Sequence, residues 1–156
     1  MLRDKNLVPL SHQHQHALAL CVRIDRAPDA SLPEFRSEIV QMWESEIRWH
    51  FNAEEQVLFP AARLHPELVR LIDELLRDHV LIRDYVQQAR EGALEPVSTR
   101  AFAAALSAHV RKEERQLFEE CQRLFDPEQL ARFGAELQQK LAKALGQSCA
   151  MRPPFG

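Results

Sequence analysis

Apolar residues recur along this chain at intervals of three and four positions, which places them on one side of an α-helix. No stretch alternates strictly between apolar and polar residues, as a half-buried strand would. Prolines, glycines and capping residues divide the pattern into five expected helices. They run from about Pro9 or Ser11 to Arg26, from Ser31 to about Leu64, from Pro66 to about Arg90, from Ser98 to about Phe125, and from Asp126 to about Leu145.

Several residues mark where these helices begin, bend and end. Ser31 and Asp126 each precede a glutamate or glutamine by three residues, the spacing of a capping box. Gly146 is expected just past the end of the last helix. Pro60 predicts a kink or local break, because proline lacks the backbone donor that continues a helix.

The fold class that follows is all-α. Four long helices with short connections form an up-down-up-down bundle, and the fifth helix packs outside it. Residues 1–146 are expected to make up one domain, and residues 147–156 a flexible tail. The apolar stripe of the fifth helix consists of Leu130, Phe133, Leu137, Leu141 and Ala144.

Composition and charge narrow the classes of function. The chain has 156 residues, 46% of them hydrophobic and 28% charged, which is typical of a globular domain with a substantial core. A net charge of −3 predicts no nucleic-acid or membrane partner. The three cysteines form no CxxC pair, which favours a reducing, cytoplasmic location.

Each of the four long apolar stripes is interrupted near its middle by residues that should avoid a core. A lone histidine on such a face is more often a hydrogen-bonded core residue than a ligand, but here the interruptions occur in all four helices. An ionised carboxylate buried without a partner is strongly unfavourable, so a pair of metal ions is the simplest explanation. Imidazole and carboxylate suit iron, and also zinc or manganese. The interrupting residues are His14, His50, Glu54, His79, His109 and Glu113.

An internal repeat supports this hypothesis. The segments that begin at His50 and His109 both read H-x-x-x-E-E-x-x-L-F, with five identical residues. Each follows a helix with one inward histidine, His14 in the first case and His79 in the second. The chain therefore consists of two helical hairpins that each carry H…HxxxE, and packing them about a pseudo-twofold axis would gather four histidines and two glutamates.

This pattern resembles that of the hemerythrin-like (HHE cation-binding) family, from about Leu7 to Phe125. The resemblance implies a non-haem di-iron centre with carboxylate bridges and an oxo or hydroxo bridge. It also implies that all six residues of the H…HxxxE pattern are metal ligands: His14, His50, Glu54, His79, His109 and Glu113.

Two departures from the oxygen carriers of that family bear on function. Their third helix has a paired HxxxH, whereas Leu75 and Arg83 stand at that spacing from His79. Their last carboxylate is an aspartate at a longer spacing, whereas this chain has Glu113. Both differences favour the broader bacterial group, for which the resemblance implies sensing of O2, NO or peroxide, iron handling or stress defence. An unidentified protein partner would then read the signal.

Neighbouring residues leave alternatives open. His16 lies on the face of the first helix opposite His14 and is the reserve ligand. Glu55, Glu114 and Asp78 stand beside ligand positions and could hydrogen-bond a ligand histidine, but a solvated face is the expected place for them. Two other functions compete with binding and sensing, namely a di-iron oxidase or peroxide-consuming enzyme, and a metal-stabilised interaction bundle. The sequence leaves turnover and the oligomeric state undecided.

Overall fold

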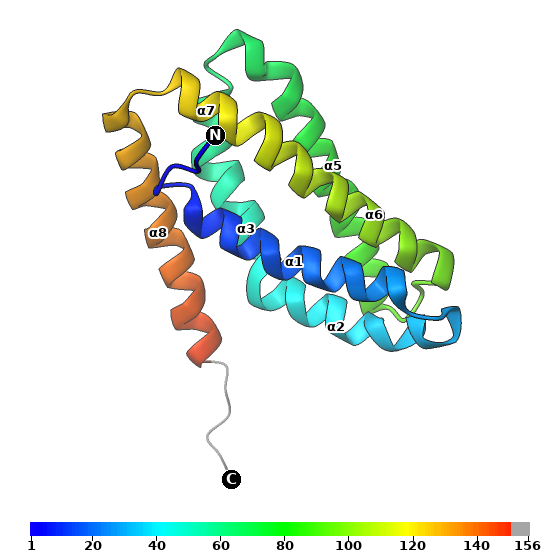
Figure 1. Cartoon of the computed structure of the whole chain (residues 1–156). Coiled ribbons are helices and arrows are strands. Elements are labelled where there is room, and N and C mark those ends of the chain that lie inside the picture. Colours follow the sequence, from blue (N-terminus) through cyan, green and yellow to red (C-terminus); the bar gives the residue numbers. More distant parts are fainter. Residues whose placement is uncertain (151–156) are drawn as a thin grey trace.

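The computed structural model describes residues 1–150, with side chains up to Ala142. Within this range every regular element is a helix or helical turn, which confirms the expected all-α class (Figure 1). Four long helices lie side by side and alternate in direction, and the C-terminal helix α8 packs outside them against the second long helix.

The second and fourth long helices are continuous but contain wider, π-helical turns. The first and third are the regular helices α1 (Val8–Arg26) and α5 (Val69–Arg90). The second long helix consists of α2 (Phe35–Met42), π turn η2 (Trp43–Ile47), α3 (Arg48–Ala53), π turn η3 (Glu54–Leu58) and α4 (Phe59–Ala62). The fourth consists of α6 (Pro96–Lys112), π turn η5 (Glu113–Leu117) and α7 (Phe118–Leu124). The C-terminal helix α8 spans Pro127–Ala150.

The ends of the helices agree only in part with the expected caps. Asp126 and Gln129 form a reciprocal capping box, with N–H···O distances of 3.0 and 2.8 Å. The prediction for Ser31 is wrong, because it lies inside the 3-10 helix η1 (Asp29–Glu34) and caps nothing. The prediction for Ser98 is also wrong, because the fourth helix already begins at Pro96, whose fixed φ suits the first turn.

The last helix extends beyond its expected end. α8 continues through Gly146 to Ala150, because one glycine costs a helix only about 1 kcal/mol relative to alanine. The expected contact of Ala144 lies outside the described side chains, and residues 151–156 of the expected tail lie outside the described residues. The boundary between domain and tail therefore stays a prediction.

The expected kink at Pro60 is replaced by a π turn. The helix passes through Pro60 with η3 directly before it. The fourth helix has a π turn at the corresponding place, η5, without any proline. The two turns begin at Glu54 and Glu113, the glutamates of the repeated motif. Such turns concentrate at functional sites, and the one in the fourth helix shows that a π turn at this place needs no proline.

A buried polar layer separates two apolar clusters of the bundle core. One cluster includes Leu10, Leu75 and Phe118, and α8 adds Leu130, Leu137 and Leu141 to it. The other includes Ile24, Ile82 and Phe102. The buried polar and charged residues are His14, His50, Glu54, His79, Thr99, His109 and Glu113.

Candidate metal centre

Four helices bring the six residues that were expected as ligands into one cluster. None of the six is more than 4% exposed, and both glutamates are fully buried. The histidines form two pairs. The first pair comprises His14 of α1 and His50 of α3, and the second pair comprises His79 of α5 and His109 of α6.

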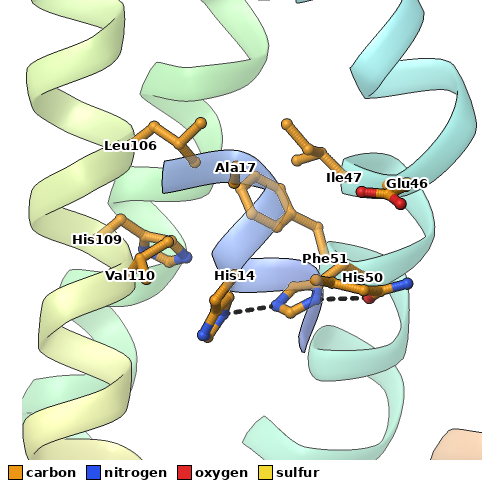
Figure 2. Close-up of a pocket in the computed structure, with 10 residues that line it drawn as sticks. His14, Ala17, Glu46, Ile47, His50, Phe51, Leu106, His109 and Val110 are labelled. Carbon is orange, nitrogen blue, oxygen red and sulfur yellow. Dashed lines mark hydrogen bonds between the residues drawn. The ribbon is translucent and has the colours of Figure 1, made fainter. Parts of the chain in front are cut away.

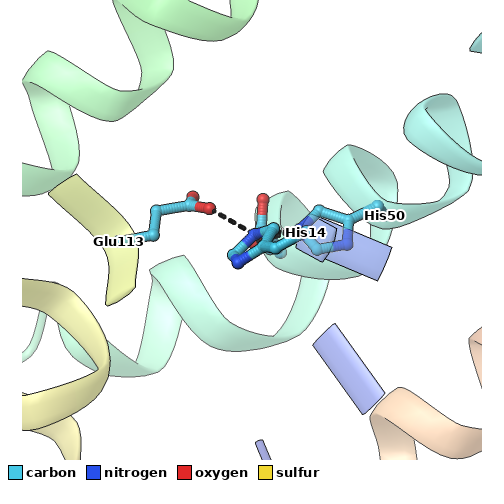
Figure 3. Close-up of side chains that lie close together, drawn as sticks. His14, His50 and Glu113 are labelled. Atoms are coloured by element: carbon cyan, nitrogen blue, oxygen red, sulfur yellow. Dashed lines mark hydrogen bonds and ion pairs between the residues drawn. The ribbon is translucent and has the colours of Figure 1, made fainter. Parts of the chain in front are cut away.

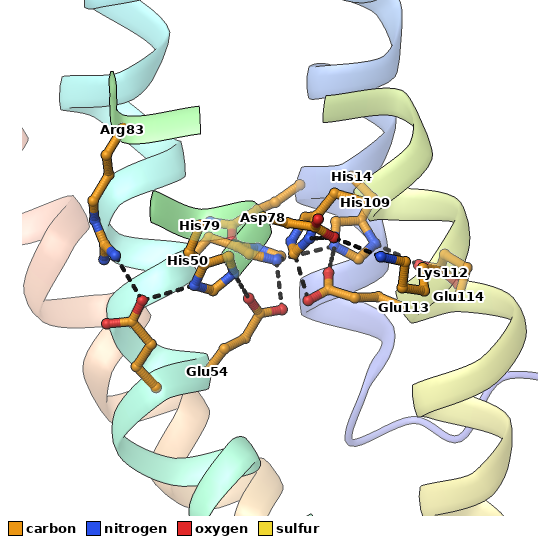
Figure 4. Close-up of polar contacts among 12 residues, drawn as sticks. His14, His50, Glu54, Asp78, His79, Arg83, His109, Lys112, Glu113 and Glu114 are labelled. Atoms are coloured by element: carbon orange, nitrogen blue, oxygen red, sulfur yellow. Dashed lines mark hydrogen bonds and ion pairs between the residues drawn. The ribbon is translucent and has the colours of Figure 1, made fainter. Parts of the chain in front are cut away.

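Glu54 lies between the two pairs. Its Oε1 is 2.9 Å from Nε2 of His50, and its Oε2 is 3.3 Å from Nε2 of His79. One oxygen of this carboxylate therefore faces each pair (Figure 4).

Glu113 has the same relation to the other two histidines. Its Oε2 is 3.0 Å from Nε2 of His14 (Figure 3). Its Oε1 is 3.2 Å from Nε2 of His109. The two glutamates are thus related by the pseudo-symmetry of the repeated motif.

Nε2 of His14 and Nε2 of His50 form a hydrogen bond of 3.0 Å, but the other six inner atoms of the cluster lack a hydrogen-bond partner. All four carboxylate oxygens of Glu54 and Glu113, and Nε2 of His79 and of His109, are buried without one. The close pairs described above have short distances but not the alignment of hydrogen bonds. Lone pairs that converge on shared points fit bound cations, because leaving this many buried polar atoms unpaired is unfavourable.

The potential ligand atoms fall into two overlapping groups. Those of His14, His50 and both glutamates lie within 4.8 Å of one another. Those of His79, His109 and both glutamates do so as well. The donor set and the shared carboxylates suit a metal centre within a helical bundle.

In each hairpin one histidine, His14 or His79, stands outside the HxxxE motif. A carboxylate from the other hairpin orients each of these lone histidines. Nδ1 of His79 donates to Glu55 Oε1 at 2.7 Å, and Nδ1 of His14 donates to Glu114 Oε1 at 2.7 Å. The expectation of a solvated face for these glutamates is therefore wrong. The interaction with His79 lowers the pKa of Glu55 to about 2, and Arg83 contributes to the shift. Burial raises the pKa of Glu114, but the interaction with His14 outweighs it and brings the value to about 2.

The other two histidines are held by the residue that precedes the lone histidine of their own hairpin. Nδ1 of His50 donates to Gln13 Oε1 at 2.8 Å, and Nδ1 of His109 donates to Asp78 Oδ2 at 3.3 Å. Lys112 Nζ also contacts Asp78 Oδ2, at 2.9 Å (Figure 4). A solvated face was the wrong expectation for Asp78 too.

The repeated phenylalanines also serve the cluster, which the sequence reasoning missed. Phe59 lies 5.3 Å from the ring of His79, and Phe118 stacks on His14 at 5.6 Å. The last residue of each motif thus packs on the lone histidine of the other hairpin. The repeat itself, which contains these phenylalanines, was the signal that could have found them, whereas no signal pointed to Gln13.

Without a bound cation, the buried glutamates favour protonated histidines. Burial lowers the pKa of His14, but Glu113 and Glu114 outweigh it and raise the value to about 9. Burial acts on His109 in the same way, and Glu113 and Asp78 raise its pKa to about 10. The pKa of Glu113 is well below its usual range despite burial, because His109 and His14 lie beside it. A metal ion would replace these protons.

A small pocket reaches the cluster beside the first pair (Figure 2). Its free space holds about one water-sized molecule. Its lining includes His14, His50 and His109, with mainly apolar side chains around them. Glu46 also lines the pocket, and its Oε1 lies 2.9 Å from Nδ1 of the exposed His16. The structure thus places the reserve ligand His16 on the surface and His14 in the cluster.

One comparison with known proteins gives a match, to a family of cation-binding domains. The model of the hemerythrin HHE cation binding domain matches residues 8–121. Neither the curated proteins nor the solved structures give a match. Among the described residues no helix has the length and apolar character needed to cross a membrane. The matched range includes both hairpins and all six clustered residues, and this chain belongs to the hemerythrin HHE cation-binding domain family.

Proposed function

We propose that this chain binds two iron ions and uses them to bind or sense a small oxidant or diatomic ligand, namely O2, NO or peroxide. The observation that carries the proposal is the position of the two buried glutamates, each with one oxygen toward either histidine pair. In this proposal His14 and His50 would hold one ion, His79 and His109 would hold the other, and Glu54 and Glu113 would be ligands shared by both.

The roles of the residues follow from their surroundings. Hydrogen bonds from the four Nδ1 atoms leave each Nε2 directed at the cluster. Two negative carboxylates balance part of the charge of the ions in a site that excludes most water. Bound iron would supply reversible one-electron chemistry and an acceptor for small ligands.

The pocket supports a small ligand rather than a bulky substrate. Its free space suits a molecule about the size of one water, and Ala17, Ile47 and Val110 give it an apolar wall. A diatomic gas or peroxide fits this space and this polarity. The same pocket supports iron handling only if ions pass through it, for which its apolar lining is unfavourable.

Anaerobic loading with ferrous iron, followed by air, tests the proposal. We expect about two irons per chain by metal analysis, and near-ultraviolet charge-transfer absorption after exposure to air. Continued consumption of peroxide, lost in Glu54→Ala and Glu113→Ala, would instead assign an enzyme. Binding of zinc alone, with no redox change, would assign a structural metal bundle. A chain that binds no iron would overturn the proposal.

A further inference from the structure

The N-terminal segment, residues 1–7, is held against the fourth helix although it precedes the residues that match the family. Gln122 of α7 accepts hydrogen bonds at Oε1 from Arg3 Nη1 at 3.0 Å and from the backbone N–H of Asp4 at 3.1 Å. Its amide nitrogen donates to the backbone oxygen of Leu2 at 3.0 Å. These contacts dock the segment on α7.

The segment also contacts α8 closely. The side chain of Asn6 lies against Gly134, where an added Cβ would stand 2.2 Å from Asn6 Oδ1 and 2.8 Å from Asn6 Cβ. Any side chain at position 134 must therefore displace Asn6. This glycine is needed for the approach of the segment, and not for helix geometry.

Arg3 connects this segment to the cluster. Its Nη2 donates at 2.7 Å both to Glu114 Oε2 and to the backbone oxygen of Glu114. Its guanidinium lies 5.1 Å from the ring of Phe118, and the side chain is only 18% exposed. Glu114 in turn accepts from His14 at its other oxygen. One cation thus orients a carboxylate, and that carboxylate orients a clustered histidine.

The second hairpin achieves the same arrangement from within its own helix. Arg83 Nη1 lies 2.8 Å from Glu55 Oε1, and Glu55 accepts from His79. Arg83 stands four residues after His79, so both project from one face of α5. The corresponding position after His14 is Leu18, which is apolar. The first hairpin therefore depends on the N-terminal segment for its cation.

We propose that Arg3 is a positioning residue for His14, so that docking of the N-terminal segment and metal binding at the first pair stabilise each other. The inference rests on the proposed role of His14 as a ligand. An outer partner fixes the orientation and tautomer of a ligand histidine, and it is itself effective only when held in place. Coupling between two such events is reciprocal, so metal must also stabilise the docked segment.

Two measurements on the full chain test this coupling, namely anaerobic titration with ferrous iron and hydrogen exchange of the amides of residues 4–8 by mass spectrometry. In the wild type, iron should slow that exchange about 5- to 10-fold. In Arg3→Gln, one of the two iron dissociation constants should rise about 10-fold, and the exchange should no longer respond to iron. A general loss of stability would not produce this selective pattern.

Two further variants make the result decisive. Gly134→Ala undocks the segment through Asn6 while leaving Arg3 and Glu114 intact, and it favours the α8 helix, so it should fold and weaken the same ion. Arg83→Gln should weaken one ion but leave exchange of residues 4–8 as in the wild type. The inference, but not the proposed function, would be overturned by either of two results. One is that Arg3→Gln binds both ions with wild-type affinity, and the other is that iron does not change hydrogen exchange of residues 4–8 in the wild type. A wild type that binds no iron would overturn the proposed function, and the inference with it.

Discussion

The first and second histidine pairs face the same two glutamates, but their outer surroundings differ. In the second pair both imidazoles donate to carboxylates, Glu55 and Asp78. In the first pair His14 donates to Glu114, whereas His50 donates to the neutral amide of Gln13. Gln13 and Asp78 occupy equivalent positions, each one residue before the lone histidine of its hairpin.

This difference teaches that a repeated motif can build two unequal halves of one site. A carboxylate partner makes an imidazole a stronger donor to a metal than an amide partner does. The second pair is also the more deeply buried, with His79 and His109 at most 1% exposed, while the pocket lies beside the first pair. We therefore expect the second pair to bind its ion more tightly.

The largest effect is expected from the loss of either shared glutamate, which should remove both metal sites. Glu54→Ala and Glu113→Ala each take one oxygen from both groups of ligand atoms. Loss of an outer partner already weakens metal binding about 10- to 100-fold, so the loss of a shared ligand should abolish binding of both ions. Metal analysis after gel filtration measures this. Glu136→Ala on the exposed face of α8 is the control and should keep both ions. Retention of two ions by either cluster variant would contradict the proposed role of the two glutamates as shared ligands.

Histidine variants should separate the two pairs. His14→Ala is expected to lose the ion of the first pair, and His79→Ala that of the second, with about one ion left in each. The ion that remains in His79→Ala should be the more weakly bound, because it lies at the first pair. Competition with a chromophoric chelator measures both dissociation constants. Equal affinities in the two variants would show that the outer partners do not matter.

Isosteric substitutions at the equivalent positions Gln13 and Asp78 should narrow the difference in metal affinity between the two histidine pairs. Gln13→Glu gives His50 a carboxylate partner and should tighten the first ion about 10-fold, whereas Asp78→Asn should weaken the second by a similar factor. Stepwise titration of the metal-free protein measures both changes. His16→Ala, which alters only the exposed contact with Glu46, is the matched control. Weaker binding of the first ion in Gln13→Glu, or tighter binding of the second in Asp78→Asn, would refute the assigned hydrogen bonds.

The smallest expected effect concerns pH and the metal-free protein. Because the pKa of His14 is raised to about 9 and that of His109 to about 10, their contribution to stability is complete below about pH 6.5 and is lost as the pH rises through 9 and 10. The depressed pKa of about 2 for Glu55 and Glu114 adds stability above about pH 4.5, which is lost as the pH falls toward 2. Urea unfolding with a chelator should therefore show greatest stability between about pH 4.5 and 6.5 for these groups.

Metal binding should become stronger as the pH rises. Bound ions replace the protons of His14 and His109, so affinity should rise with pH up to about 9 to 10, and protons should be released on binding. Titration in two buffers of different ionisation enthalpy counts those protons. Binding that is independent of pH would contradict the proposed ligands.

Much of the fold and of the inner cluster could be predicted from the sequence. Histidines and glutamates on the apolar faces of all four helices marked positions such as His14 and Glu113, because burial of such residues needs a cause. The outer residues could not be placed in this way. Glu55 stands one residue beyond the core-facing Glu54, and a helical wheel cannot show that the neighbouring hairpin brings His79 within 2.7 Å of it. Arg3 precedes every expected helix, so no periodic pattern pointed to it.

The π turns at η3 and η5 have a consequence for how these helices tolerate changes in length. A π turn accommodates one residue more than an α-helical turn, so each turn is equivalent to a single-residue insertion. Deleting Gln56 or Arg115 would remove that insertion and restore a regular α-helix, and the residues that follow would keep their positions in the bundle. Leu58 and Phe118, which are fully buried, would then stay in the core. Deleting one residue from the regular helix α5 would instead rotate everything that follows by about 100°, so the fold should tolerate a deletion in either π turn far better than one in α5.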